Sequence, residues 1–198
     1  MPNWCMNTLS IKSKSPEVLE AIKEFVKSET SCFSFQKIRP MPEILHHTEH
    51  PDKGFWIEHP DLPFVVDAAN PKDSHEAWQI ARGRRPMTPE ELLSLQEAGG
   101  GVINWYDWKC AYWGTKWDAY SAEIYDQEEG RICYQFNTAW SPPEPVIKAL
   151  FDHFPAAKYK LYYEESGMGF KGSLNVRPKG KSGAGLITES TTFVRMSK

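Results

Sequence analysis

The chain has 198 residues, of which 40% are hydrophobic and 25% charged, and its formal net charge is −3. This size and composition are typical of one globular core, or of a core that carries a sizeable insertion. The slightly acidic balance excludes a basic field over the whole surface of the kind that recruits nucleic acid, so any such contact needs a local basic patch.

The first forty residues predict a strand, a helix and a second extended run. Inward and outward side chains alternate along residues 4–12, which is the pattern of a strand. Ser15 and Pro16 form a helix start, and apolar residues at helical spacing carry this helix to residue 28. Residues 32–38 are predicted to be extended, and the prolines that follow close them off.

Residues 41–101 differ in character, because prolines interrupt the pattern throughout. Two short helices are predicted there, over 73–82 and 88–98. The second begins with a capping box of Thr88 and Glu91 and ends at three consecutive glycines. We interpret the segment as an insertion with short helices and loops of its own.

The remaining elements return to a regular order. The first of them is a helix over 102–112, followed by a strand over 119–125, a hairpin that ends at Gly130, and a strand over 131–139. In that last strand Cys133, Gln135 and Asn137 are predicted to face outward. A helix over 141–154, a strand over 159–165 and a hairpin partner over 167–176 follow. The basic, Gly/Ser-rich residues 177–198 form either a tail or an edge strand. With the insertion set aside, this order predicts an α+β fold, the ferredoxin-like split β-α-β sandwich, built from residues 1–40 and 102–176.

Four of the eight tryptophans lie within residues 104–118. Such a density indicates either an aromatic core junction or the wall of a binding pocket, because a buried indole N–H needs a partner. Lys109, Lys116, Asp107 and Asp118 lie between the rings. Charge and aromatic surface therefore meet in this run.

Strand ends that neighbour one another in the predicted sheet bring this run close to residues 3–7 and 138–141. A concave aromatic rim is the usual form of a ligand site. The predicted ligand-binding residues are Asn7, Lys116, Trp117, Asp118, Thr138 and Trp140. Trp117 and Trp140 would stack on a ligand, Lys116 would meet an anion, and Asn7 and Thr138 would orient it. The alternative is that the rings plug the end of the sheet, which we expect of Trp4 and Trp105 but not of Trp117.

Four strings of residues together resemble a known family. They are residues 1–7 (MPNWCMN), 113–118 (WGTKWD), 136–143 (FNTAWSPP) and 163–165 (YEE) with the glycines that follow. The chain resembles the YubB-like family of plasmid, phage and pathogenicity-island proteins, which have a ferredoxin-like domain. The resemblance implies a fold and a mobile-element context, and it carries over no catalytic residues. The cysteine spacing does not support an iron–sulfur cluster.

Metal and catalytic sites are not favoured by the sequence. His46, His47 and His50 lack a zinc-ligand spacing and are interpreted as solvated loop residues, and the four cysteines are widely separated. Glu164 and Glu165 are neighbours on a predicted strand, so they point to opposite faces and do not form an acid–base pair. We therefore predict no metal, no cofactor and a non-enzymatic role.

The leading hypothesis is an accessory protein of a mobile element that binds a host protein or a small anionic, nucleotide-like ligand through the Trp-rich rim. The alternative is a module for single-stranded nucleic acid, in which Arg82, Arg84 and Arg85 bind phosphates.

No basic-then-apolar leader and no run of about 20 apolar residues is present, so no membrane contact is expected. We predict a cytoplasmic protein with reduced thiols.

Overall fold

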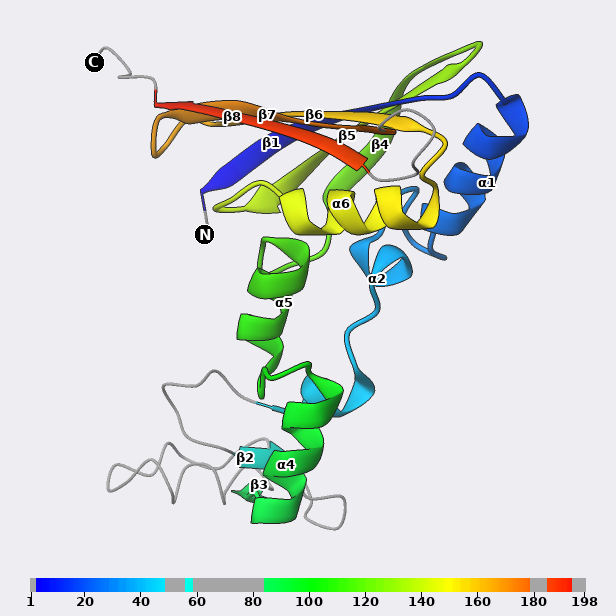
Figure 1. The fold of residues 1–198 in the computed structure, drawn as a ribbon. Coiled ribbons are helices and arrows are strands. Elements are labelled where there is room, and N and C mark those ends of the chain that lie inside the picture. The colour runs from blue at the N-terminus through cyan, green and yellow to red at the C-terminus, as the bar shows by residue number, and fades with distance from the viewer. Residues whose placement is uncertain (1–2, 49–55, 59–83, 179–184, 194–198) are drawn as a thin grey trace. The chain divides into compact units, whose positions relative to one another are not determined.

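The computed structural model describes residues 3–48, 56–58, 84–178 and 185–193 (Figure 1). The chain forms two compact units. The first combines residues 1–40 with 110–198, and the second is Met41–Lys109. The second unit contains all of residues 41–101, which the sequence sets apart as an insertion, and continues to Lys109.

In the described residues, the first unit contains a six-stranded antiparallel sheet and three complete helices, together with the end of a further helix. Its elements are β1 (Trp4–Lys12), α1 (Pro16–Val26), α2 (Phe35–Ile38), β4 (Tyr120–Glu128), β5 (Arg131–Ala139), α6 (Glu144–His153), β6 (Lys158–Glu165), β7 (Phe170–Pro178) and β8 (Gly185–Phe193). The strand order is β4-β5-β1-β6-β7-β8. The first four strands, with α1 and α6 as the connecting helices, have the ferredoxin-like arrangement that the sequence predicts. The strands β7 and β8 extend the sheet beyond it.

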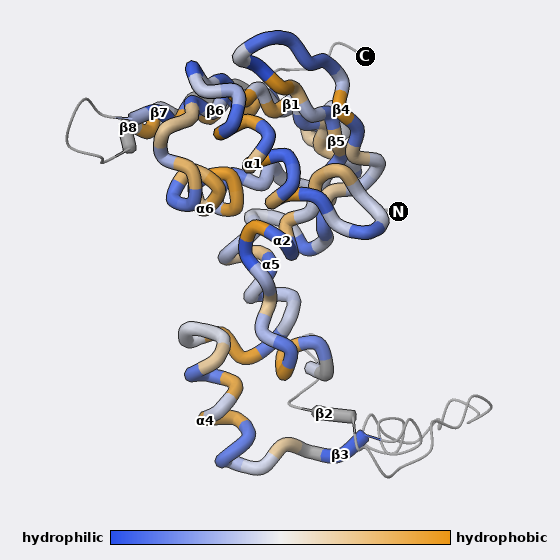
Figure 2. Tube along the Cα trace, turned by 90° about the vertical axis from the view of Figure 1, so that its right-hand side faces the viewer, coloured by the Kyte–Doolittle hydropathy of each residue, from blue (hydrophilic) through white to orange (hydrophobic). Residues whose placement is uncertain are grey.

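The core lies between one face of this sheet and the helices. Along β1, Cys5, Asn7, Leu9 and Ile11 are buried, while the residues that alternate with them are not. Their register partners on β5 and β6 are buried as well, so one face of the sheet is apolar across three strands. The helix α6 covers this face with five buried side chains and is the most continuously hydrophobic helix in Figure 2.

Helices lie on only one side of the sheet in the described part of the first unit (Figure 1). We call the other side the open face. It carries the alternate residues of each strand, among them Trp4, Met6 and Lys12 of β1. Any partner that docks on the sheet itself must use this face.

One prediction for this unit is wrong, and one residue on the open face is more buried than expected. Residues 35–38 form the short helix α2 where an extended run is expected, because the carboxylate of Asp118 accepts hydrogen bonds from the backbone N–H groups of Phe35 (2.6 Å) and Gln36 (3.4 Å). Cys133 lies on the open face, as expected, because it pairs with Ser10 of β1, yet only 5% of it is exposed. Asp126 of β4 pairs with Cys133 and forms an ion pair with Arg131, which lies on the same face two residues before Cys133.

The C-terminal segment contains β8, which pairs with β7 along its whole length. Of the two forms considered for residues 177–198, the edge strand is therefore the one present over Gly185–Phe193. The predicted helix over 73–82 lies outside the described residues.

The second unit contains the 3-10 helix η1 (Glu43–His47), the strands β2 (Trp56–Glu58) and β3 (Arg84–Pro86), and the helix α4 (Pro89–Ala98). The helix α5 (Trp105–Trp113) begins in this unit and ends in the first. The capping box of Thr88 and Glu91 is present at the start of α4, as predicted. No described helix is long and apolar enough to cross a membrane.

Candidate ligand-binding rim

One end of the sheet gathers the aromatic residues that the sequence singles out. The ring of Trp4 stacks on that of Tyr120 at 4.9 Å and 15°, and it meets Trp117 at 6.0 Å with a tilt of 49°. The Nζ atom of Lys116 lies 4.4 Å from the centre of the Trp117 ring. We call Trp4, Lys116, Trp117 and Tyr120 the aromatic rim.

The rim is accessible. Trp117 is 39% exposed and Tyr120 57%, and Trp4 is half-buried between them. A tryptophan ring that plugs the core would have no accessible face. The exposure of Trp117 is therefore that of a residue in the wall of a binding site. Stacked rings with a cation on one of them form a surface that suits a planar, electron-rich ligand bearing negative charge.

Backbone geometry fixes the loops that carry the rim. The hydroxyl of Thr115 donates to the carbonyl of Ala139 at 2.9 Å, and the backbone N–H of Trp140 donates to the carbonyl of Asn3 at 3.0 Å. Gly114 has a φ of +85°, and a Cβ atom there would lie 2.6 Å from Pro145 and 2.8 Å from the carbonyl of Pro142. The loop after α5 is thus held against the loop after β5, and only glycine fits at their contact.

Trp113 and Trp140 occupy different places from the rim. Trp113 is 2% exposed, and its indole N–H donates to the carbonyl of Arg39 at 2.8 Å. Trp113 is therefore the core tryptophan of this unit, a role that the sequence assigns to others. Trp140 is 42% exposed, and within the described residues it makes no ring contact with the rim.

Asn7 and Thr138 lie beneath the rim instead of on its surface. They are 1% and 0% exposed. The side-chain amide of Asn7 donates to the hydroxyl of Thr138 and to the carbonyl of Cys5, both at 2.9 Å, and Thr138 donates to the carbonyl of Ser141 at 2.7 Å. These bonds tie β1 to the end of β5, so the two residues support the loops that hold the rings.

Asp118 is engaged on the helix side of the sheet. Besides the bonds to α2, it accepts the hydroxyl of Ser34 at 2.7 Å and the backbone N–H of Ala119 at 2.7 Å. Its lone pairs are thereby used in joining the rim loop to α2. Of the six predicted residues, the structure leaves Lys116, Trp117 and Trp140 at the surface.

Tyr120 and Trp4 are the rim residues that are missing from the six predicted ones. The signal for them is the register of the sheet. Trp4 pairs with Ala139 and Tyr120 with Asn137 on the neighbouring strand, which puts both rings on the open face at the same end. The register of β4 depends on a β-bulge, at which the pairing shifts after Tyr120. The sequence alone does not show where this bulge lies, so it does not show the register either.

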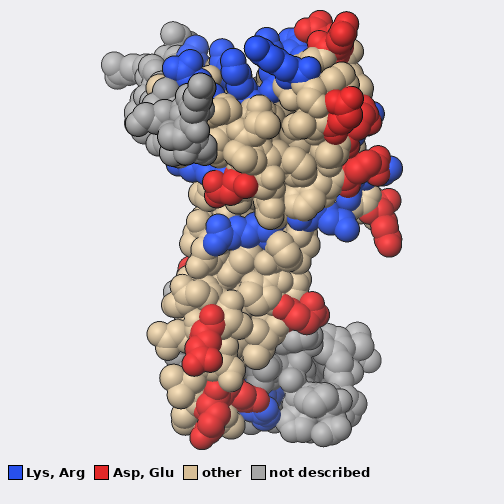
Figure 3. Space-filling view, turned by 45° about the vertical axis from the view of Figure 1, so that its right-hand side comes forward, with Lys and Arg blue, Asp and Glu red and all other residues tan. Residues whose placement is uncertain are grey.

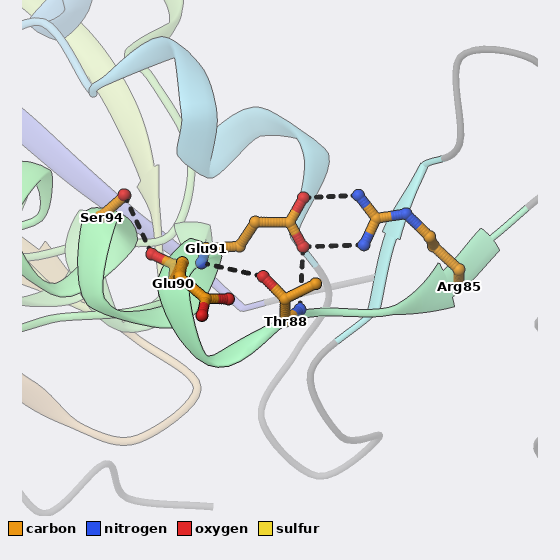
Figure 4. A network of polar contacts seen from close by, with 5 residues as sticks. All are labelled: Arg85, Thr88, Glu90, Glu91 and Ser94. Carbon is orange, nitrogen blue, oxygen red and sulfur yellow. Dashed lines mark hydrogen bonds and ion pairs between the residues drawn. The ribbon is translucent and has the colours of Figure 1, made fainter.

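The predicted arginine cluster lies in the second unit. Arg85 donates through both Nη atoms to the carboxylate of Glu91, at 2.7 and 2.5 Å, as Figure 4 shows. A guanidinium that is held in this way is already paired with an anion. Arg84 is half-buried, and burial lowers its pKa. Arg82 lies outside the described residues.

We expect the Arg85–Glu91 pair to persist into acid. The hydrogen bonds from Arg85, and then the bond from the backbone N–H of Thr88, lower the pKa of Glu91 from its ordinary 4.5 to about 2. A depressed carboxyl pKa adds stability above the ordinary value and loses it as the pH falls towards the depressed one. Glu91→Gln should therefore destabilise α4 by about 1 kcal/mol above pH 5, with the difference vanishing below pH 2. Amide hydrogen exchange in α4 checks this, with Glu90→Gln as the matched control.

Two of the thiols and one carboxylate of the described residues are buried. Burial raises the pKa of Cys5 to about 12, and Cys133 is buried. No group of three His, Cys, Asp or Glu side chains is placed to hold a metal ion in the part of the chain that the structure describes. Glu165 is buried and accepts backbone N–H bonds in the turn that follows it.

Residues 116–191 match the family model described as the ferredoxin-like domain in Api92-like protein. This segment includes all of β4 to β7 and most of β8. A crystal structure of protein api92 from Yersinia pseudotuberculosis is similar at 12% sequence identity and a TM-score of 0.48, over 88% of this chain and 94% of that one. No curated protein matches the chain. These descriptions name a fold and a protein, and neither names an activity.

Proposed function

We propose that this chain is a non-enzymatic binding protein whose aromatic rim captures a small nucleotide-like ligand. Together with the resemblance to YubB-like proteins, this gives an accessory protein of a phage or plasmid that works in the host cytoplasm. The observation that carries the binding proposal is the stack of Trp4 on Tyr120 beside the exposed ring of Trp117, with Lys116 at 4.4 Å.

The chemistry of the rim favours a nucleotide over a purely apolar ligand. A nucleobase stacks on aromatic rings with about 1–3 kcal/mol per base, and its phosphate adds an attraction to a nearby cation. Lys116 supplies that cation, and no ion-pair partner competes for it among the described residues. A docking surface on a host protein that presents a stacked aromatic and an acidic group would use the same four residues.

Calorimetric titration with mononucleotides and cyclic nucleotides tests the proposal. Trp117→Ala should weaken binding about 5- to 150-fold, since it removes one stacking partner. Trp140→Ala is the matched control, because it deletes a ring of similar exposure outside the rim, and it should leave the affinity unchanged. Lys116→Gln should reduce the salt dependence of binding.

The proposal fails if no nucleotide binds at millimolar concentration. It also fails if Trp117→Ala binds as the natural chain does, or if Trp140→Ala is the variant that loses affinity. Thermal unfolding of each variant, measured without ligand, shows that a loss of binding is not a loss of fold.

A further inference from the structure

The end of the open face opposite the aromatic rim is basic. Lys12 of β1, Lys158 and Lys160 of β6 and Arg177 of β7 are all exposed there. With Ser10 and Asn175 they line a groove of about 450 Å³. Figure 3 shows Lys and Arg side chains side by side along the top of the sheet unit. A chain with a net charge of −3 thus concentrates positive charge on one small surface.

The register forces these charges together. Lys12 lies directly opposite Lys158 in the β1–β6 pair, and Lys160 is one step along the same face, opposite Ser10. Like charges directly opposite each other destabilise an antiparallel pair. None of the four cations has an ion-pair partner among the described residues.

A neighbouring cation on the same face, Arg131, is neutralised by carboxylates. Arg131 is opposite Lys12 on the other side of β1, and it forms ion pairs with Asp126 and with Glu128, the latter at 2.7 Å. The β4 edge of the face is therefore neutralised by its own carboxylates. The β1–β6–β7 side retains its positive charge and has the electrostatic character of an anion site.

An aromatic ring lies on the same face next to the basic groove. Tyr162 is 42% exposed and follows Lys160 on β6, two positions along the face. From Lys12 back to Trp4 the strand β1 spans about 26 Å, at roughly 3.3 Å per residue. Such a length accommodates no more than about eight stacked nucleotides.

We propose that the open face binds single-stranded nucleic acid, with phosphates on Lys12, Lys158, Lys160 and Arg177 and a base stacked on Tyr162. Exposed aromatic rings beside a line of cations are the two elements that bind a single strand without reading its sequence. The acidic side chain of Glu123 on β4 lies at the flank of this face and repels the second strand of a duplex. This site shares no residue with the aromatic rim, so either can fail without the other.

The test is fluorescence anisotropy of a labelled single strand of about twelve nucleotides, titrated with the full chain from about 50 to 200 mM salt. Lys158→Gln/Lys160→Gln should weaken binding roughly tenfold at the lowest salt and lower the salt slope by about 1.4, or 0.7 for each lost phosphate contact. The matched control is Lys27→Gln/Lys37→Gln, which removes the same charge from exposed positions at the end of α1 and on α2. It should bind as the natural chain does.

Further measurements distinguish a single strand from other anionic ligands. Tyr162→Ala should weaken binding of the strand and leave binding of an abasic strand of the same length unchanged. No binding at low salt, equal affinity for a duplex, or equal losses in the two double variants would each overturn the proposal. So would inorganic polyphosphate that binds as tightly as the strand, because the bases would then contribute nothing.

Discussion

Replacing Trp113 with alanine is expected to lower the free energy of unfolding by about 3–5 kcal/mol, the range for emptying a large aromatic site in a core. The side chain is 2% exposed, lies edge-on to Phe35 at 5.9 Å, and donates to the carbonyl of Arg39. Its removal leaves both a cavity and an unpaired backbone carbonyl.

Trp117→Ala is the matched control, because it deletes the same side chain four residues later. The ring is 39% exposed, so the expected loss is about 1–2 kcal/mol. Urea denaturation followed by circular dichroism measures both variants. Equal losses in the two would mean that Trp117 is a core residue, and the rim would then be a structural plug.

Asp118→Ala is expected to cost about 2–4 kcal/mol, since one carboxylate caps α2 and its loss deprives the buried backbone N–H of Phe35 of this acceptor. The N–H groups of Phe35 and Gln36 and the hydroxyl of Ser34 all donate to it. Asp118→Asn keeps one acceptor oxygen and should cost about half as much.

Asp152→Ala serves as the comparison for Asp118, because Asp152 is exposed on α6. A surface change of this kind should stay within about 0.5 kcal/mol. Denaturation midpoints of the three variants decide the matter. If Asp118→Ala were as mild as Asp152→Ala, the bonds between the rim loop and α2 would contribute nothing to the fold.

The strands could be predicted because their side chains alternate. Residues 4–12 and 131–139 follow a period of two closely enough that the strand bounds match those of β1 and β5. The order of strands and helices then restricts the topology to a ferredoxin-like sheet. Local patterns also predict Thr88 and Glu91 at the start of α4, because the residues of a capping box lie within four consecutive positions of the sequence.

The candidate site could be predicted only in part, because its members are set by contacts distant in sequence. Asp118 and Phe35 are far apart in the chain, so nothing local shows that the carboxylate will turn residues 35–38 into a helix. The roles of the tryptophans depend likewise on which face of the sheet or helix each one occupies. Trp113 and Trp117 occur in the same run, yet one is buried and the other exposed.

The contacts of Arg39 have a consequence for how the chain could have acquired its second unit. The guanidinium carbon of Arg39 lies 4.1 Å from the ring centre of Tyr112, and its carbonyl accepts the indole N–H of Trp113. The two places where the chain leaves and re-enters the sheet unit are thus fastened to each other from within that unit. Because doubling the length of a loop costs only about 0.6 kcal/mol, the sheet tolerates a long or a short segment between such anchored ends. The anchored ends therefore favour changes in the length of the chain between Arg39 and α5 over changes within the sheet itself.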